Sequence, residues 1–374
     1  MTLSAIALVL AVGLIGPALA SWQRGHIPVA VGEILVGVLF GPGGLHAIPV
    51  GDPTLTLLES IGFALVMLVV GSHLNVRAFG DRVIARHALR IVLLNLGAAV
   101  VIAFVIQAIT GYANVPLFAL LLTSSSAAIV LPVLDAIDGT RDTRVLIASV
   151  TIADVSSIVG LPLIMRSGNP GQTTIVALAI AGIACVGFRA LRAAHRRGTL
   201  ERFRDFSTQH RFGLELRISL LVVIGLAAFA SHYHVTVMIA GFAVGIVIAA
   251  VGAPQRLAGQ LFAVTEGFFS PVFFVMLGTS LDVRHMLTDA RGMALAVALS
   301  VGTVLVHLTS RVLGLPVPQA LMSGAQLGVP VAAVTIGAAA GTLTAVESSA
   351  ILTAALVSIL ITALAARSLE GTAS

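Results

Sequence analysis

The sequence predicts an all-α membrane protein that crosses the bilayer many times. Of its 374 residues, 58% are hydrophobic and 10% are charged, whereas about a quarter of the residues in a soluble domain are charged. Most of the apolar stretches reach the length of about 20 residues that a helix needs to cross a bilayer. They lack the alternation of apolar and polar residues that marks transmembrane barrel strands. These observations exclude both a water-soluble globule and a membrane barrel.

Thirteen apolar stretches are predicted as membrane-spanning helices. They cover residues 3–21, 27–46, 54–72, 88–109, 115–136, 144–165, 172–190, 214–231, 234–252, 260–280, 291–311, 316–340 and 347–366. The first stretch ends in Ala-Leu-Ala-Ser, which resembles a signal-peptidase site. It lacks the basic segment that begins a signal peptide, so we count it as a span.

The arginines predict the orientation of the chain. All 21 basic residues are arginine. If the N-terminus lies outside, the cytoplasmic connections hold most of them, and only Arg166, Arg284 and Arg291 are left outside. By the positive-inside rule we expect a multi-pass protein of a bacterial-type inner membrane, with its N-terminus outside and its C-terminus in the cytoplasm.

One long polar connection divides the sequence into two halves. We expect a first half at residues 1–188, an arginine-rich cytoplasmic linker at 189–213 and a second half at 214–374. The arginines of the linker favour contact with anionic lipid headgroups, with a regulatory surface as the alternative. They do not indicate a nucleic-acid partner.

Residues 121–163 contain the polar groups on which the prediction of function depends. Four consecutive hydroxyl residues and a proline interrupt the fifth span: Thr123, Ser124, Ser125, Ser126 and Pro132. Asp154 lies near the middle of the sixth span. A carboxylate is costly in hydrocarbon, so Asp154 is a functional-site hypothesis. Two structural alternatives stay open, because hydroxyls also join membrane helices and an aspartate can pair with an arginine to hold helices together.

Two similar segments indicate an internal repeat. The third span contains VMLVVGSHLNVR and the tenth contains FFVMLGTSLDVR, so that four residues recur after 207 positions: Gly71, Leu74, Val76 and Arg77 as Gly278, Leu281, Val283 and Arg284. An odd number of spans separates the copies, which predicts the inverted-topology repeat of secondary transporters.

The repeat pairs the interrupted fifth span with the twelfth. That span is interrupted in turn by glycine, glutamine and proline: Gly324, Gln326, Gly328 and Pro330. We therefore predict two discontinuous helices, with breaks near residues 123–132 and 324–330. Interrupted helices in corresponding positions of two halves point to a transport site.

The chemistry of these residues suits a small cation. Hydroxyls and backbone carbonyls freed by a broken helix form an oxygen-rich shell, and Asp154 adds one negative charge that a proton or a monovalent cation can neutralise. Arg311 is the predicted basic partner of Asp154, with an ordinary positive-inside arginine as the alternative. His307 is either a pH-sensing accessory or a satisfied core histidine. Glu33 is an accessory ion ligand or a water-lined or helix-capping residue.

Several apolar motifs, in order, carry a family resemblance. They are GEILVGVLFGPGGL, SSSAAIVLPVL, the aspartate-bearing sixth span, SPVFFVMLGTSLD and RVLG. Together they resemble the monovalent cation:proton antiporter-2 family, which includes bacterial sodium/proton antiporters and potassium efflux systems, over about residues 3–366. The resemblance implies the sodium/proton antiporter fold with two crossing discontinuous helices, and a homodimer. Its ion-binding aspartate falls on Asp154, its hydroxyl positions on Ser124, Ser125 and Ser126, and its core basic residue on Arg311.

Two departures from the family pattern refine the expectation. Ala153 occupies the position of the first member of an acidic pair that many electrogenic relatives have, so we predict electroneutral exchange at Asp154 alone. The sequence also stops soon after the last span, so we expect the membrane domain only, without a nucleotide-binding regulatory domain.

The sequence therefore predicts a transporter that exchanges Na⁺ or K⁺ for H⁺. The HExxH, CxxC, P-loop and nucleophile-elbow patterns are not present, so we expect neither an enzyme nor a cofactor. The alternatives are a membrane scaffold or sensor that keeps the fold without transport, and an exporter or symporter of a small organic ion.

Overall fold

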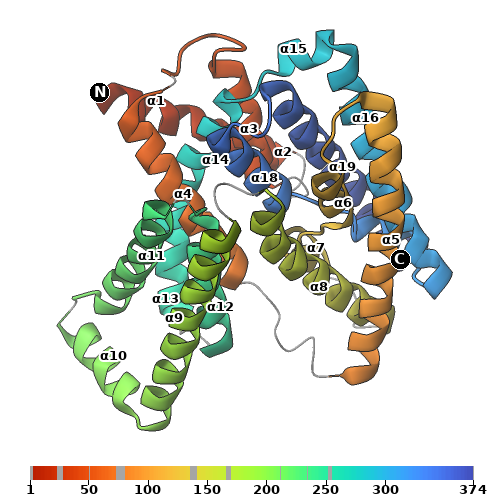
Figure 1. Ribbon diagram of the computed structural model, residues 1–374. Coiled ribbons are helices and arrows are strands. Elements are labelled where there is room, and N and C mark those ends of the chain that lie inside the picture. The colour runs from red at the N-terminus through yellow and green to blue at the C-terminus, as the bar shows by residue number, and fades with distance from the viewer. Residues whose placement is uncertain are drawn as a thin grey trace. The chain divides into compact units, whose positions relative to one another are not determined.

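The computed structural model describes residues 3–22, 28–49, 51–72, 81–134, 141–165, 170–210, 212–233, 235–251 and 255–373. Every regular element in these residues is a helix, and Figure 1 shows their course. The predicted all-α class is confirmed. The recurring residues of the repeat at positions 74, 76 and 77 lie outside the described part, as do the loop arginine Arg166 and residue 24.

Eight of the described helical segments are long and apolar enough to cross a membrane. They are α4 (Pro53–Ser72), α5 (Arg82–Thr110), α8 (Arg141–Ile164), α9 (Pro170–Arg196), α11 (Leu214–His232), the run of α13 (Gln255–Val264), η2 (Thr265–Phe269) and α14 (Ser270–Thr279), then α16 (Ala290–Leu308) with η3 (Thr309–Leu313), and α19 (Ala345–Ala373).

Five shorter apolar segments account for the remaining predicted spans. They are α1 (Leu3–Gly13) with α2 (Ile15–Trp22), α3 (Val29–Phe40), α6 (Val115–Thr123) with α7 (Ala127–Leu134), α12 (Met238–Val251) and α18 (Gly328–Ala340). In order along the chain, the long and short segments together match the thirteen predicted spans. The other helices are α10 (Thr199–Gln209) and α15 (Val283–Thr288), and α17 (Val317–Met322), which precedes α18. The predicted linker is therefore largely helical, because it contains the end of α9 and α10.

The chain forms two compact units that interleave along the sequence. The first comprises Met1–Ala11, Gly51–Val76 and Arg166–Met276, and the second comprises Val12–Val50, Arg77–Met165 and Leu277–Ser374. In the first unit α4 lies along α12 (Figure 1). A Cβ atom added at Gly241 would lie 1.9 Å from the carbonyl oxygen of Ala64, so glycine permits this close approach of the two backbones.

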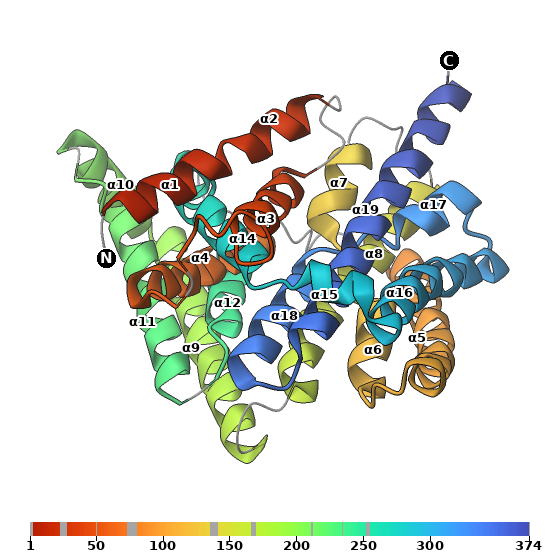
Figure 2. The same ribbon diagram turned by 90° about the horizontal axis from the view of Figure 1, so that it is seen from above.

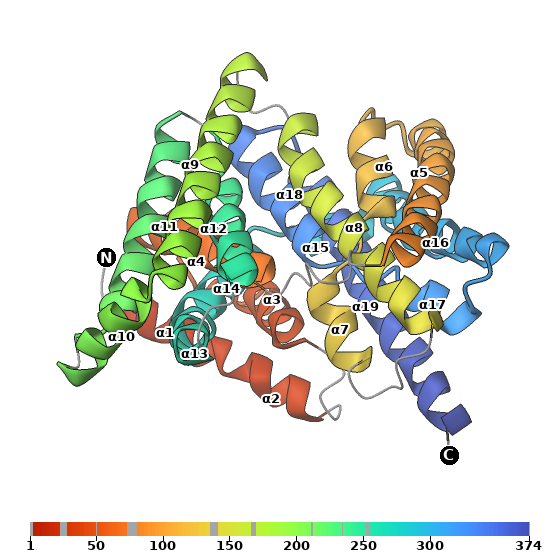
Figure 3. The same ribbon diagram turned by 90° about the horizontal axis from the view of Figure 1, so that it is seen from below.

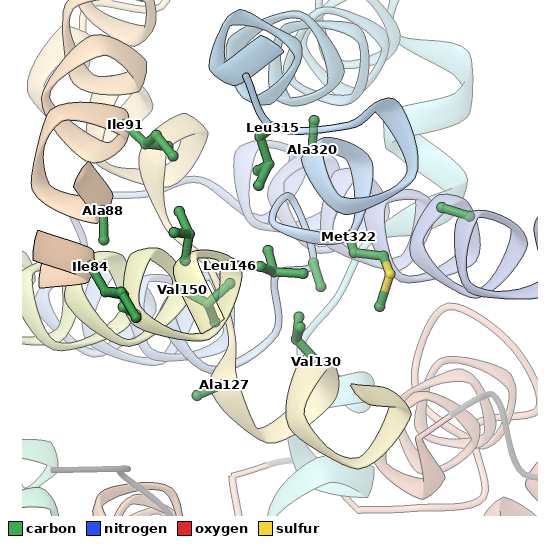
Figure 4. Packing of buried hydrophobic residues seen from close by; sticks show 14 of the residues in the cluster. Ile84, Ala88, Ile91, Ala127, Val130, Leu146, Val150, Leu315, Ala320 and Met322 are labelled. Carbon is green, nitrogen blue, oxygen red and sulfur yellow. The ribbon is translucent and has the colours of Figure 1, made fainter. Parts of the chain in front are cut away.

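The second unit holds all the residues predicted for the ion site. In this unit α5, α6 and α16 lie side by side (Figure 2), and α8 lies between α6 and α18 (Figure 3). Buried apolar residues join α5, α7 and α8 to the region of α17 (Figure 4): Ile84, Ala88, Ile91, Ala127, Val130, Leu146, Val150, Leu315, Ala320 and Met322. This core fixes α8, which carries Asp154, against the two interrupted helices.

Matched helix contacts in the two units bear out the repeat. A Cβ atom added at Gly71 of α4 would lie 2.6 Å from the carbonyl oxygen of Phe242 in α12. One added at Gly278 of α14 would lie 2.2 Å from the carbonyl oxygen of Ile34 in α3. The neighbouring contacts also correspond. The Cβ atom added at Gly71 would also lie close to Gly245 and Ile246, and the one added at Gly278 would also lie close to Gly37 and Val38. The glycines that recur in sequence therefore perform the same packing role in each unit.

Candidate ion-binding site

The fifth span is a broken helix. Helix α6 ends at Thr123 and α7 begins at Ala127, and the three residues between them are extended or irregular. Thr123, Ser124, Ser125 and Ser126 are all buried. A helix that ends leaves carbonyl groups without intrahelical partners, and a helix that begins leaves amides without them. The break thus presents backbone oxygens at the end of α6 and backbone N–H groups at the start of α7. The predicted break extended to Pro132, which instead lies within α7.

The carboxylate of Asp154 lies beside the first residue of α7. Its side chain projects from α8 and is buried, and its Oδ2 atom accepts a hydrogen bond of 3.1 Å from the backbone N–H of Ala127. Ala127 is the first residue of α7, where the partial positive charge of the helix dipole favours an anion. This single amide does not neutralise the carboxylate. A buried charge requires a pairing partner, which here a proton or a cation can supply.

The hydroxyl groups beside the break have their hydrogens directed to backbone carbonyls. Thr123 Oγ1 donates to Ala119 at 2.8 Å and Ser124 Oγ donates to Leu121 at 2.8 Å, both within α6. Ser125 Oγ donates instead to the carbonyl oxygen of Ser323, at 2.7 Å. A hydroxyl that uses its hydrogen in this way keeps its oxygen lone pairs. These oxygens are therefore suited to ligate a hard cation.

The twelfth span is broken too, and Ser125 connects the two breaks. Helix α17 ends at Met322 and α18 begins at Gly328. In the residues between them, the backbone N–H of Gln326 donates to Ser358 Oγ at 3.1 Å, and its side-chain amide donates to Thr303 Oγ1 at 3.4 Å. The predicted break reached Pro330, but this proline lies in the first turn of α18, where its missing N–H has no intrahelical role.

Arg311 does not pair with Asp154 in this conformation. Arg311 is exposed on η3, and the ion pair found in the described residues joins His285 and Asp282 instead. The predicted pairing is therefore not formed here. The reason is positional, since η3 continues α16 to its exposed end while Asp154 is buried in the middle of α8.

His307 is the basic residue of α16 that is buried beside the breaks. Its Nδ1 atom lies 2.8 Å from Ser323 Oγ and 3.5 Å from the side-chain amide of Asn95. The Oδ1 atom of Asn95 accepts a hydrogen bond of 3.0 Å from Thr309 Oγ1. Sequence reasoning missed Asn95 and Ser323. The signals that could have found them are an amide within the apolar fourth span and a serine next to a predicted break.

Two further predicted positions lie within the helices. Ala153 is buried in α8 next to Asp154 and adds no polar group. Glu33 is buried in α3, where its side chain packs against Gly16 of α2.

The chain resembles known transporters along most of its length. Residues 7–370 match the family model described as sodium/hydrogen exchanger, transmembrane. The chain is 24% identical over 311 residues to the putative Na(+)/H(+) antiporter YjbQ of Bacillus subtilis, covering 77% of this chain and 49% of that protein. It is 23% identical over 270 residues to the probable Na(+)/H(+) antiporter 3 of Methanocaldococcus jannaschii, covering 70% and 68%. The chain thus spans about half the length of the first of these relatives.

A solved structure shares the fold. The sodium proton antiporter MjNhaP1 from Methanocaldococcus jannaschii at pH 8 matches with a TM-score of 0.58 at 16% identity, covering 99% of this chain and 97% of that one. The match extends over both interrupted helices and over the helices that surround them.

Proposed function

Since the chain belongs to the sodium/hydrogen exchanger family, we propose that it exchanges a monovalent cation for protons across a membrane. The observation that carries this proposal is the buried carboxylate of Asp154, bound to the first amide of α7 beside a run of buried hydroxyls. The names of the two relatives, both Na(+)/H(+) antiporters, support the same activity.

In the proposed cycle Asp154 holds either one proton or one cation. A bound cation would be ligated by the carboxylate and by hydroxyl and carbonyl oxygens at the break, with Ser124 and Ser125 among the hydroxyl candidates. A proton at Asp154 removes the negative charge, so that the cation leaves. A bare carboxylate at the bilayer centre costs about 2.5–3.5 kcal/mol or more, which disfavours crossing with the site empty. Exchange follows because the site changes sides at low free-energy cost only when Asp154 holds a proton or a cation.

We further propose that the exchange is electroneutral. Ala153 precedes Asp154, so α8 offers one carboxylate at this point in place of two. One proton and one monovalent cation then alternate at one site. Imposing a membrane potential across proteoliposomes should leave the initial rate unchanged. A rate that rises or falls steeply with the potential would contradict this stoichiometry.

Finer assignments follow from the sequence motifs. We propose the monovalent cation:proton antiporter-2 group, potassium beside sodium as a transported ion, and a homodimer. The chain is proposed to lie in a bacterial-type inner membrane, with a cytoplasmic C-terminus and the α9–α10 arginines near anionic lipid. Cross-linking in native membranes tests the dimer.

The proposed activity is tested by collapsing a pH gradient in proteoliposomes. A pH-sensitive dye is trapped inside, a gradient is imposed, and Na⁺, K⁺ or Li⁺ is added in turn. We expect at least one cation to dissipate the gradient with the wild-type protein, and none with Asp154→Asn. Asp289→Asn is the matched control, because Asp289 caps α16 and asparagine caps helices equally well.

The control variant should exchange ions at the wild-type rate. If no cation moves protons in the wild type, the proposal is wrong, and a non-transporting scaffold or an organic-ion transporter takes its place. If Asp154→Asn transports normally, Asp154 is not the exchange site.

A further inference from the structure

A chain of buried polar groups runs from α16 to the first break. It begins at His307, which is 1% exposed, and passes through Ser323 at the end of α17 to Ser125 between α6 and α7. All three residues belong to the second compact unit. The exchange mechanism proposed above uses Ser125 but assigns nothing to His307 or Ser323.

Ser323 is held from two directions. Its Oγ atom lies 2.7 Å from the carbonyl oxygen of Ala320, in its own helix, and 2.8 Å from Nδ1 of His307. It is the residue after the last turn of α17 and is followed directly by Gly324. The backbone N–H groups of Ser323 and Gly324 still donate to the carbonyl oxygens of Gln319 and Leu321, whereas the carbonyl oxygen of Ser323 lies beyond the last turn of α17. The imidazole therefore adds a side-chain anchor beside the peptide group that follows Ser323, whose carbonyl oxygen has no partner within the helix.

That peptide group orients one hydroxyl of the ion site. The carbonyl oxygen of Ser323 accepts the hydrogen of Ser125 Oγ at 2.7 Å. Thr123 and Ser124 differ, because their hydroxyls donate to carbonyls three or four residues earlier in α6 itself. Ser125 is thus the hydroxyl whose direction depends on the other interrupted helix. The direction of its hydrogen determines the direction of its lone pairs, and therefore whether the oxygen can ligate a cation.

The imidazole also contacts the first break itself. The backbone carbonyl groups of Leu122 and Ser124 face its ring. On the other side, the ring lies against the second break, since a Cβ atom added at Gly324 would be in van der Waals contact with Cδ2 of His307, at 3.4 Å. The ring is consequently in contact with both interruptions at once.

We propose that His307 is a positioning residue that fixes Ser323, and through it the hydroxyl of Ser125, and thereby sets the affinity of the exchanger for its cation. This inference rests on the proposed exchange at Asp154. It assigns no proton and no cation to His307, which acts through its hydrogen bond to Ser323.

The test compares cation affinity in four single variants and one double variant reconstituted in proteoliposomes. His307→Leu removes the hydrogen bond to Ser323, and Ser323→Ala removes its other half. The loss of a buried hydrogen bond corresponds to about a tenfold change in an equilibrium constant. We expect each variant to raise the cation concentration at half-maximal rate about tenfold, with the maximal rate within about threefold of wild type. His307→Asn places an amide near the position of Nδ1 and should recover most of the affinity.

The fourth variant, Ser310→Ala, is the matched control. Ser310 is buried on the next turn, and its hydroxyl donates to the backbone carbonyl of His307, with no bond toward the breaks. It should leave cation affinity unchanged. The double variant of His307→Leu and Ser323→Ala should equal either single variant, because both remove the same interaction. A merely structural role predicts additive losses in the double variant and no recovery by asparagine.

A second readout measures binding without transport. Na⁺ should raise the unfolding temperature of the purified protein, and the half-saturating Na⁺ concentration should shift about tenfold in Ser323→Ala. Unchanged affinity in Ser323→Ala overturns the proposal even if His307→Leu fails to fold. If affinity is unchanged while Asp154→Asn abolishes exchange, the positioning role alone is wrong. If Asp154→Asn exchanges normally, the proposed function itself is wrong.

Discussion

The two interrupted helices are broken alike but held differently. At the break between α6 and α7, an acidic side chain binds the freed amide of Ala127. At the break between α17 and α18, neutral hydroxyls bind the backbone and side-chain amides of Gln326. The first break thus carries a charge that needs a mobile counter-charge, and the second is satisfied by fixed hydrogen bonds. A broken helix alone therefore does not make an ion site. The role of each break depends on whether a charged or a neutral group binds its freed amides.

Removing the amide that binds Asp154 should have the largest effect of the substitutions at the breaks. Ala127→Pro deletes the donor at the first position of α7, where proline is compatible with a helix. Hydrogen bonds to charged groups contribute about 1.5–3 kcal/mol, so cation affinity should change by about tenfold or more. Initial exchange rates over a range of cation concentrations measure the change. Ala127→Gly keeps the N–H group and should change cation affinity little. Equal effects of both variants would contradict the claim that this amide determines the role of the first break.

Ser125→Ala cuts the hydrogen bond between the two breaks. It removes one oxygen ligand and the contact to the carbonyl of Ser323, and we expect about a tenfold loss of cation affinity. Ser149→Ala serves as the control, because Ser149 is a buried serine of α8 whose hydroxyl bonds within its own helix. Transport assays on both variants should separate them; similar losses would indicate a general effect of buried serines.

Gln326→Leu tests whether the second break contributes to stability without binding the ion. It removes the hydrogen bond between the side-chain amide of Gln326 and Thr303 Oγ1, and the expected cost is about 1–3 kcal/mol of unfolding free energy. Cation affinity should stay within about twofold of wild type. Thermal unfolding and exchange assays on the same preparation measure the two quantities. A tenfold loss of affinity with unchanged stability would mean that the second break also binds the ion.

Arg311→Gln should have the smallest effect. The side chain is exposed on η3 and forms no ion pair with Asp154 in the described residues. We expect cation affinity and maximal rate to stay within about twofold of wild type. A loss comparable to that of Asp154→Asn would show that the two residues pair in another state of the cycle.

The helices could be predicted from the sequence, but the hydrogen-bond partners within the site could not. Hydropathy predicts the thirteen spans, and the recurrence of Gly71 as Gly278 predicts a repeat whose packing is visible in both units. The breaks end earlier than predicted, because α7 includes Pro132 in its interior and α18 includes Pro330 in its first turn, where a proline is tolerated. The predicted partner of Asp154 was Arg311, which directly precedes the second interrupted helix in sequence. Which amide actually binds it depends on long-range packing that no local pattern encodes.

Cation-induced proton release tests the central claim most directly. Purified protein in weakly buffered detergent solution is titrated with Na⁺ or K⁺ while a dye reports the pH. If Asp154 alternates between one proton and one cation, the wild type should release about one proton per cation bound, and Asp154→Asn should release none. Saturable cation binding by the wild type without proton release, or undiminished release from Asp154→Asn, would contradict the account.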